Sequence, residues 1–380
     1  MRSKLDNVLA KTPRRRFLKT SALGLSAVAI SPSILAGIHE TKLPDEEKLG
    51  VALVGLSWYG TDFIATAFEH SKYCKLTGFV TGKPDADKAK DFQKKYDIKD
   101  KNIYSYDSFD EMADNPDIDM VYIVLPNGLH ADFTIRAAKA GKHVICEKPM
   151  EVSVERGQSM IDACKNAGRL LQIGYRCQFD PYHREIMRLS REKVFGEVKL
   201  IQTSFSFFGV NSDNWRFTNK ELSGGGPMMD IGVYCIQGAR YTMGVEPVAI
   251  TARTYKTYMD KLPDMEETAV WEMEFPNGAI VSCVSSYVGR DDYIHVSAEK
   301  GSFGLRPCYN ADPQGLPEGY FNDQKMNFPR QNQQAVQLDA FARNILDGTP
   351  VIASGEDGLQ DLRIIEAIYK AAKTGERIEL

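Results

Sequence analysis

Residues 48–60 read KLGVALVGLSWYG and decide the fold of the first half of this 380-residue chain. A short apolar run that ends at a glycine is typical of a buried parallel strand. Gly55, Ser57 and Gly60 match the pattern G-x-G-x-x-G, except that serine replaces the second glycine. In that pattern the glycines allow a tight turn, and the following helix presents its N-terminus to a dinucleotide pyrophosphate. Taken alone, the motif fits a plain strand–turn–helix equally well.

Strand and helix patterns alternate from residue 48 to about residue 175. Apolar runs predict strands at 48–56, 76–81, 120–126, 143–146 and 170–175. Helical spacing, in two cases closed by a glycine, predicts helices at 59–72, 85–96, 130–140 and 154–167. This alternation predicts a doubly wound parallel sheet, a Rossmann domain over residues 48–172. Ligands bind such sheets beyond the carboxyl ends of the strands.

The second half, residues 173–380, has a different pattern. Longer strands with alternating apolar and polar residues are expected at 198–208, 249–258, 268–275, 279–287 and 293–298. Helices are expected at 227–243, 333–346 and 359–373, and a long Pro/Gly/Asn-rich loop at 306–329. This pattern predicts an α+β domain with a large, open, mostly antiparallel sheet.

The first 36 residues behave as a separate segment. Residues 12–19 read TPRRRFLK, and an uncharged run of small and apolar residues follows. Paired arginines before such a run resemble a twin-arginine export signal, which predicts a periplasmic or extracytoplasmic location. A basic tail without a targeting role is the alternative. The run is too short and too rich in Ser and Ala for a membrane span.

Composition excludes several classes of protein. Hydrophobic residues make up 43% and charged residues 26% of the chain, which excludes a disordered or collagen-like protein. The first 36 residues hold seven bases and one acid, which leaves 40 bases and 50 acids and a net charge of −10 in the remainder. This acidic body argues against nucleic acid as a partner. The seven cysteines form no C-x-x-C pair, so neither a disulfide framework nor a metal site is expected.

The end of the second predicted strand bears on cofactor preference. An acid that binds the ribose 2′-hydroxyl of NAD usually stands about 20 residues after the glycines. Here Thr81 and Gly82 stand in that region, with Lys83 and Lys88 nearby and no acid before Asp85. A hydroxyl and two lysines suit a 2′-phosphate, so the sequence favours NADP over NAD. The alternative is that both lysines are solvated surface charges.

Several short motifs follow one another at a specific spacing. Leu125–His130 reads LPNGLH, Cys146–Pro149 reads CEKP, and Gly174–Arg176 reads GYR. Further motifs are WR at 215–216, GGG at 224–226, MDIGVY at 229–234 and GEDG at 355–358. In this order they resemble the glucose-fructose oxidoreductase/inositol dehydrogenase (Gfo/Idh/MocA) family over residues 48–380. That resemblance implies a nicotinamide-dependent oxidoreductase that commonly oligomerises through its open sheet.

Three residues are the candidate catalytic set. Lys148 stands where the resemblance places the nicotinamide ring, and Glu147 is expected to orient it or the ribose. Asp230 and Tyr234 are four residues apart, which puts both on one face of a helix. A tyrosine next to a lysine can act as general acid and base at a sugar hydroxyl, with Asp230 holding the sugar. The alternatives are a surface Glu–Lys pair and a core tyrosine.

The resemblance extends the cofactor site to further residues. Trp58 and Tyr59 belong to the glycine turn, and Tyr106 packs near the cofactor. Arg176 and Arg216 contact the cofactor or the substrate. The residues expected along the cofactor path are Leu125, Pro126, Asn127 and His130.

These features together predict an exported, NADP-dependent sugar oxidoreductase. Two cofactor modes are open, one in which the cofactor remains bound and cycles between oxidation of one sugar and reduction of another, and one in which it dissociates. The segment between Ala36 and Lys48 is short and has few prolines, which favours the second. A homodimer or homotetramer is expected, with no nucleic-acid partner and no membrane contact beyond export. Two alternatives remain open, a nicotinamide-dependent glycosidase of the same fold and a non-catalytic sugar sensor. The presence of Lys148, Asp230 and Tyr234 argues against the sensor.

Overall fold

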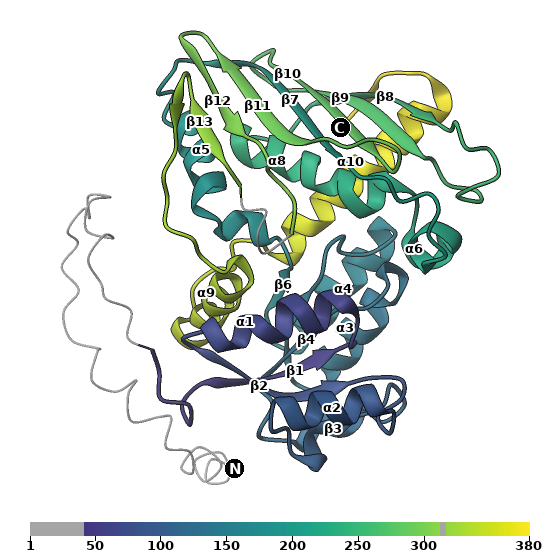
Figure 1. Ribbon diagram of the computed structural model, residues 1–380, viewed down its shortest axis with the longest axis vertical. Helices are drawn as coiled ribbons and strands as arrows, with labels where there is room; N and C mark the ends of the chain where they lie inside the picture. Colours follow the sequence, from purple (N-terminus) through teal and green to yellow (C-terminus); the bar gives the residue numbers. More distant parts are fainter. Residues whose placement is uncertain (1–41, 312–316) are drawn as a thin grey trace, which may run out of the picture. The chain divides into compact units, whose positions relative to one another are not determined.

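The first half of the chain folds into the predicted parallel sheet (Figure 1). The computed structural model describes residues 42–311 and 317–380, and the predicted export signal lies outside them. Six strands lie in the order β3-β2-β1-β4-β5-β6, and all neighbours are parallel. They are β1 (Leu49–Val54), β2 (Cys74–Val80), β3 (Ile103–Tyr104), β4 (Met120–Ile123), β5 (His143–Cys146) and β6 (Leu171–Ile173).

Helices cover both faces of this sheet because its strands are apolar on both sides. Leu53 packs into a core with Phe68 and Leu338, whereas the next residue, Val54, packs into a core with Phe133. One face therefore carries α1 (Ala65–His70), α2 (Asp87–Lys95) and α9 (Gln333–Asp347), and the other carries α3 (His130–Lys139) and α4 (Val154–Asn166). The sheet is doubly wound, as predicted. Helix α9 comes from the last 50 residues of the chain. The sequence pattern predicted this helix but did not indicate that it packs on the parallel sheet.

The second half contains a nine-stranded sheet in the order β14-β13-β12-β11-β7-β10-β9-β8-β15. Among the described strands of this second sheet, β7 and β10 are parallel neighbours and every other pair is antiparallel. The predicted, mostly antiparallel sheet is therefore confirmed. Its long strands are β7 (Val198–Ser206), β8 (Ala249–Tyr255), β9 (Thr268–Glu274), β10 (Ile280–Ser286) and β11 (Asp292–Ala298). Its shorter strands are β12 (Gly301–Leu305), β13 (Gly319–Phe321), β14 (Gln324–Lys325) and β15 (Ile378–Glu379).

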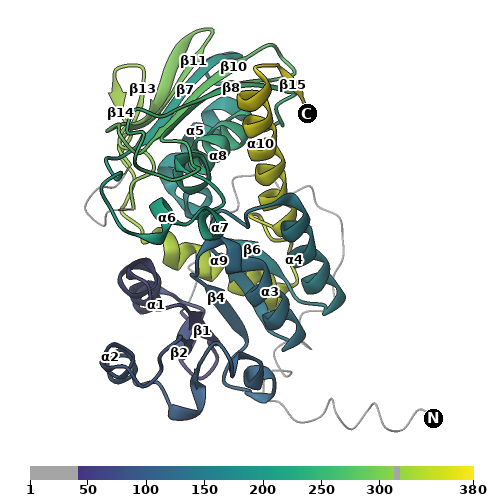
Figure 2. The same ribbon diagram turned by 90° about the vertical axis from the view of Figure 1, so that its right-hand side faces the viewer.

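Three helices pack on one face of the large sheet, as Figures 1 and 2 show. They are α5 (Pro181–Arg191), α8 (Val233–Met243) and α10 (Gly355–Thr374). Strand residues such as Trp271, Val281 and Ile294 alternate inward and are buried. On the opposite face Leu200 and Glu272 are exposed, and no described helix covers them in either view.

Two expectations about secondary structure were wrong. The segment 306–329 is not entirely loop, because β13 and β14 lie within it and extend the sheet at its edge. Residues 312–316 of this segment lie outside the described residues. Helix α5 was missed, although Asp180 accepts hydrogen bonds from the backbone N–H groups of Tyr182 and His183 and so begins this helix in the usual way.

All seven cysteines are buried, and none forms a disulfide. Across 42–311 and 317–380, no cluster of three or more His, Cys, Asp or Glu side chains is arranged to hold a metal. The same residues contain no helix with the length and apolar character that a membrane crossing requires.

Candidate active site

The glycine turn after β1 is tighter than any other residue type would allow. Gly55 has a φ of +98°, and a Cβ atom placed on it would lie 2.4 Å from the carbonyl oxygen of Val124. A Cβ on Gly60 would lie 2.6 Å from the carbonyl oxygen of Gly55. Both glycines of the motif are therefore required by close backbone approach, before any ligand is considered.

Serine at the second-glycine position fits an anion site. Ser57 Oγ accepts a hydrogen bond from the backbone N–H of Gly60 at 3.2 Å, so its own hydrogen is free to be donated. It stands before the helical residues η4 (Gly60–Ile64), at the end that favours negative charge. Trp58 next to it is 61% exposed, with its ring against Phe63. The residues present therefore fit a dinucleotide phosphate.

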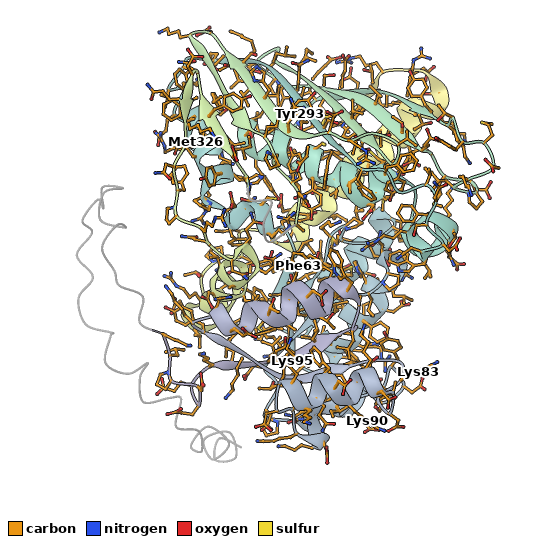
Figure 3. All side chains as sticks on the ribbon, viewed as in Figure 1. Phe63, Lys83, Lys90, Lys95, Tyr293 and Met326 are labelled. Atoms are coloured by element: carbon orange, nitrogen blue, oxygen red, sulfur yellow. The ribbon has the colours of Figure 1, made fainter. Side chains whose placement is uncertain are left out.

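The residues predicted to bind a 2′-phosphate follow β2, and the structure places one of them, Lys88, beside the glycine turn. Tyr106 lies against the turn after Thr81, since a Cβ on Gly82 would be 3.2 Å from its ring. Lys88 Nζ donates to the carbonyl oxygen of Leu56 at 2.7 Å, which places an ammonium group beside the glycine turn. Lys83 is exposed near the start of α2 (Figure 3).

The end of β5 holds a buried carboxylate and a lysine. Glu147 Oε1 accepts from the hydroxyl of Tyr122 at 2.8 Å, and Oε2 accepts from the backbone N–H of Lys148 at 3.2 Å. Burial raises the pKa of Glu147, while Lys148 and the Tyr122 hydrogen bond partly oppose that rise. A Cβ on Gly174 would lie 2.8 Å from Glu147 Oε1, so only glycine lets β6 close over this carboxylate. The peptide bond between Lys148 and Pro149 is cis.

Lys148 meets Asp230 and Tyr234 across the space between the two sheets. Its Nζ donates to the carbonyl oxygen of Asp230 at 2.7 Å and lies 3.6 Å from Asp230 Oδ1. The same nitrogen is 4.9 Å from the centre of the Tyr234 ring. Asp230 lies in a π-helical turn, η9 (Met228–Gly232), and Tyr234 lies in the first turn of α8. The structure therefore brings the three proposed catalytic residues together.

The carboxylate of Asp230 is surrounded by positive charge and a phenol. Arg216 Nε lies 3.8 Å from Oδ1, and the hydroxyl of Tyr287 donates to Oδ2 at 3.1 Å. Burial by itself raises the pKa of Asp230, but Arg216, Lys148 and Tyr287 outweigh it and hold the pKa below its ordinary value. The side chains of Lys148 and Asp230 remain 13% and 14% exposed, so solvent still reaches this pair.

The fold and this arrangement of residues agree with the comparison to known families. Residues 49–175 match the oxidoreductase family profile with an NAD-binding Rossmann fold, and residues 183–304 match the profile of the Gfo/Idh/MocA C-terminal domain. The chain belongs to the Gfo/Idh/MocA family. The resemblance inferred from the short motifs is thereby confirmed.

Relatives within the Gfo/Idh/MocA family include named sugar enzymes. A D-xylose 1-dehydrogenase (NADP⁺) of Haloarcula marismortui is 29% identical, and the match covers 87% of this chain and 92% of the relative. A second D-xylose 1-dehydrogenase (NADP⁺), from Haloferax volcanii, is 31% identical over 73% of this chain and 85% of the relative. The crystal structure of an aldose-aldose oxidoreductase from Caulobacter crescentus, complexed with glycerol, has a TM-score of 0.83 and 39% identity. It covers 88% of this chain and all of that chain.

Three residues of this Gfo/Idh/MocA protein that were predicted to contact cofactor or substrate make their polar contacts with other protein groups. His130 is fully buried, and its ring nitrogens lie 2.9 Å from the carbonyl oxygen of Leu125 and 3.0 Å from that of Pro149. Burial lowers the pKa of His130, and the ring joins two loops instead of lining a path. Asn127, also buried, donates to the carbonyl oxygen of Ser223 at 2.8 Å.

Arg176 is the third of these residues. It is buried, and its guanidinium donates to Gln333 and to the carbonyl oxygen of Tyr309. Its central carbon lies 5.3 Å from the centre of the Tyr234 ring. Arg176 therefore lies against the proposed acid–base tyrosine, with its two terminal nitrogens bonded to protein groups. Leu125 and Pro126 lie in the loop that precedes His130, and Leu125 contributes the carbonyl oxygen that His130 contacts.

Sequence reasoning missed the residues that support the site. Glu266 accepts from the backbone N–H groups of Gly226 and Met228 at 3.1 and 3.0 Å and from the Tyr369 hydroxyl at 3.1 Å, so it holds the start of η9. Tyr122 and Tyr287 bond the two carboxylates of the site. Each supporting residue stands far along the chain from its partner and belongs to no short motif, so no local pattern marks it.

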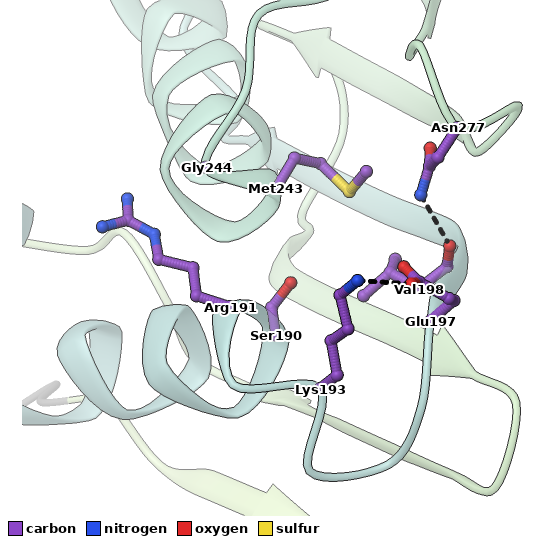
Figure 4. Close-up of a pocket in the computed structure, with 8 residues that line it drawn as sticks. All are labelled: Ser190, Arg191, Lys193, Glu197, Val198, Met243, Gly244 and Asn277. Carbon is purple, nitrogen blue, oxygen red and sulfur yellow. Dashed lines mark hydrogen bonds and ion pairs between the residues drawn. The ribbon is translucent and has the colours of Figure 1, made fainter.

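A separate pocket lies between the ends of α5 and α8 and the start of β7 (Figure 4). Two of its charged groups pair with each other, since Lys193 Nζ lies 2.5 Å from Glu197 Oε1. It contains none of the predicted site residues, being lined by Ser190, Arg191, Lys193, Glu197, Val198, Met243, Gly244 and Asn277. The candidate active site therefore rests on the arrangement around Lys148 and not on this pocket.

Proposed function

We propose that this protein is an NADP-dependent sugar oxidoreductase that transfers hydride between nicotinamide and a CH–OH carbon of a sugar. The observation that carries the proposal is the meeting of Lys148 with Asp230 and Tyr234 at the carboxyl end of β5. Relatives named for aldose–aldose and D-xylose oxidoreduction support the substrate class. The intact proton-transfer set supports an enzyme over a sensor.

Each residue of the set has a distinct part in the proposed reaction. The nicotinamide, when bound, accepts or supplies the hydride. Asp230, an ionised acceptor, takes a hydrogen bond from a sugar hydroxyl and orients the reacting carbon. During oxidation of the sugar the phenolate form of Tyr234 takes the proton from the reacting hydroxyl, and during reduction the phenol returns it. The ammonium of Lys148, 4.9 Å from the centre of that ring, stabilises the phenolate.

Preference for NADP is supported by the groups at the end of β2. Lys88 already donates to Leu56 beside the glycine turn, and an ammonium has further hydrogens for a 2′-phosphate. No acid stands between Thr81 and Asp85, where an NAD enzyme often holds the ribose. The NADP⁺-dependent relatives point in the same direction.

The proposal also includes cofactor retention and export. The cofactor remains bound while one sugar is oxidised and another reduced, which suits a compartment without a free dinucleotide pool. The twin-arginine pattern at 12–19 supports export of the folded, loaded protein to the periplasm. The open face of the nine-stranded sheet is the surface we assign to a homodimer or homotetramer.

The decisive experiment uses protein purified without added cofactor. Dinucleotide released by denaturation is identified and counted by mass spectrometry. The native protein is then incubated with an aldose deuterated at C1 and a second, unlabelled sugar, with no added NADP⁺. About one NADP per chain and deuterium in the second sugar are expected. Lys148→Ala serves as the matched protein that binds cofactor without transferring the label.

The outcomes separate the candidate functions. Turnover only with added NADP⁺ contradicts retention and leaves a dissociable dehydrogenase. Steady glycoside hydrolysis without label transfer between sugars supports the glycosidase. No turnover with any sugar and no dinucleotide contradicts the enzyme proposal. Export is tested separately with Arg15→Lys combined with Arg16→Lys, which should retain the protein in the cytoplasm.

A further inference from the structure

The first two turns of α9 carry three glutamines that lie close to the candidate active site. Gln333, Gln334 and Gln337 are each more than nine-tenths buried. Gln334 Nε2 donates to the Tyr59 hydroxyl at 3.2 Å, and Gln333 accepts from the guanidinium of Arg176. These neutral amides therefore contact the glycine turn and the arginine behind the proposed acid–base tyrosine. Gln337 is connected to the proposed catalytic lysine by further hydrogen bonds.

Hydrogen bonds run in one direction from Gln337 to Glu147. Gln337 Nε2 donates to the Tyr122 hydroxyl oxygen at 2.7 Å, and that hydroxyl donates to Glu147 Oε1 at 2.8 Å. An amide nitrogen has hydrogens and no lone pair to share, so it can only donate. The single hydroxyl hydrogen of Tyr122 is consequently directed at Glu147.

Glu147 then accepts on both oxygens. Oε1 takes the Tyr122 hydroxyl and Oε2 takes the backbone N–H of Lys148. Two donors favour the ionised carboxylate, whereas burial opposes it. The ionisable groups that act on it come from four different segments, namely Lys148, Arg176, Tyr59 and Tyr122.

We propose that Tyr122, held by Gln337, is a positioning residue for Glu147. Through Glu147 it fixes the main chain at Lys148, so that the lysine side chain reaches Asp230. The inference rests on the proposed function, because it assigns Lys148 the role given above. It goes further because the residues that position this lysine lie in β4 and α9, which contact neither sugar nor nicotinamide in the proposed reaction.

The test compares Tyr122→Phe, Gln337→Met and the control Tyr104→Phe. Tyr104 is also a buried tyrosine on the parallel sheet, and its hydroxyl oxygen accepts from Asn115 at 2.7 Å, away from Glu147. The titration of Glu147 is followed by NMR in cofactor-free protein labelled with ¹³C in its glutamate carboxyl groups. Glu147→Gln identifies the resonance. Turnover is measured against pH, with kcat and KM separated.

Tyr122→Phe should raise the proton affinity of Glu147 about tenfold, since it removes a hydrogen bond to a charged group. The acidic limb of kcat should move to higher pH, with little change in KM for the sugar. Gln337→Met should shift both in the same direction by a smaller amount, and Tyr104→Phe should shift neither. An unchanged Glu147 titration in Tyr122→Phe, or an equal shift in Tyr104→Phe, overturns the proposal.

The NMR titration needs no substrate, so it is independent of the proposed function. If wild-type protein oxidises no sugar but Tyr122→Phe moves the Glu147 titration, the proposed function fails while the hydrogen-bond control stands. If sugar oxidation is found and the titration does not move, the positioning role fails alone. A thermal melt of each variant identifies any that does not fold. Should Tyr122→Phe fail to fold, the same comparison is made between Gln337→Met and Tyr104→Phe.

Discussion

The two ends of the parallel sheet use their charged side chains differently. At the amino ends, Lys142 Nζ donates to the carbonyl oxygens of Asn115 and Ile118, both at 3.0 Å. His143, the first residue of β5, accepts from the backbone N–H of Leu170 at 3.0 Å. These side chains complete the hydrogen bonding of nearby backbone. At the carboxyl end of the same strand, Lys148 instead reaches across to the second half of the chain.

The difference shows how one strand serves both stability and chemistry. When a side chain that forms hydrogen bonds to buried backbone groups is removed, those groups lose their partners. Its removal is therefore expected to change the free energy of unfolding. A charged group that faces another charge while keeping access to solvent can still exchange protons and bind a ligand. Substitutions at the carboxyl ends should therefore change rates, and substitutions at the amino ends should change stability.

The largest effect is expected for Lys148→Ala and Tyr234→Phe. Each removes a proposed partner of the proton transfer, so kcat should fall by about 10²- to 10⁴-fold. The rate is followed by transfer of deuterium from the labelled aldose to the second sugar, and NADP released on denaturation shows that the fold is intact. If both variants keep most of their turnover, the mechanism is wrong and the contrast between the two ends fails.

A smaller effect is expected for Asp230→Asn. The loss of a charged acceptor for the sugar should lower kcat/KM by about 10- to 100-fold, since hydrogen bonds to charged groups contribute about 1.5–3 kcal/mol. Tyr287→Phe is the matched variant, because it removes only the hydroxyl that donates to Asp230, and a loss of about fivefold is expected. Equal losses in the two variants would contradict a direct contact between Asp230 and the sugar.

Cofactor preference should change in Lys83→Ala combined with Lys88→Ala. Removing both ammonium groups is expected to raise the Kd of cofactor-stripped protein for NADP about tenfold and to leave its Kd for NAD unchanged. Lys90→Ala, an exposed lysine on the same helix, is the control (Figure 3). A parallel loss with NAD would show that the lysines support the turn and do not read the 2′-phosphate.

The amino end of the sheet gives the smallest expected effect, in acid stability. Burial, aided by Arg169, lowers the pKa of His143 to about 4 from an ordinary value of 6.5. Below pH 6.5 the unfolded chain takes up a proton that the folded protein refuses, so stability falls between pH 6.5 and 4 and then levels off. In His143→Gln this part of the pH dependence should disappear.

Urea unfolding of wild type and His143→Gln at pH 7, 5.5 and 4.5 measures that difference. Activity per folded molecule should be unchanged, in contrast to the substitutions around Lys148. The exposed His70 supplies the control substitution His70→Gln. If the free energies of unfolding of wild type and variant fall in parallel down to pH 4.5, His143 does not contribute to the pH dependence of stability.

Elements defined by local pattern could be predicted from the sequence. Strand β5 has the predicted bounds, and α3 and α4 end within a residue or two of the predicted positions. Gly55 and Gly60 were found because a tight turn needs glycine wherever it occurs. The spacing of Asp230 and Tyr234 predicted that they share one helix face, whereas their meeting with Lys148 followed from the family resemblance.

Features that depend on contacts far apart in sequence could not be predicted. Short edge strands such as β14 exist because β13 pairs with them, not because of their own two residues. The motif that contains His130 lies at a strand end, which suggested that this side chain could contact a cofactor. In the structure two carbonyl groups from different loops enclose it. Glu266 and Tyr122 act through partners 38 to 40 and 25 residues away, and periodicity carries no information at that range.

Helix α9 has a consequence for how the chain is made. Leu338 and Phe341 pack into the same core as Val51 and Leu53 of the first strand. While a ribosome is still synthesising the second half, one face of the parallel sheet lacks this cover and exposes apolar side chains to water. The first domain to be synthesised therefore cannot finish folding until residues 333–347 have been made. A nascent chain stalled before residue 333 should bind a chaperone that recognises apolar surface, and the full 380-residue chain should not.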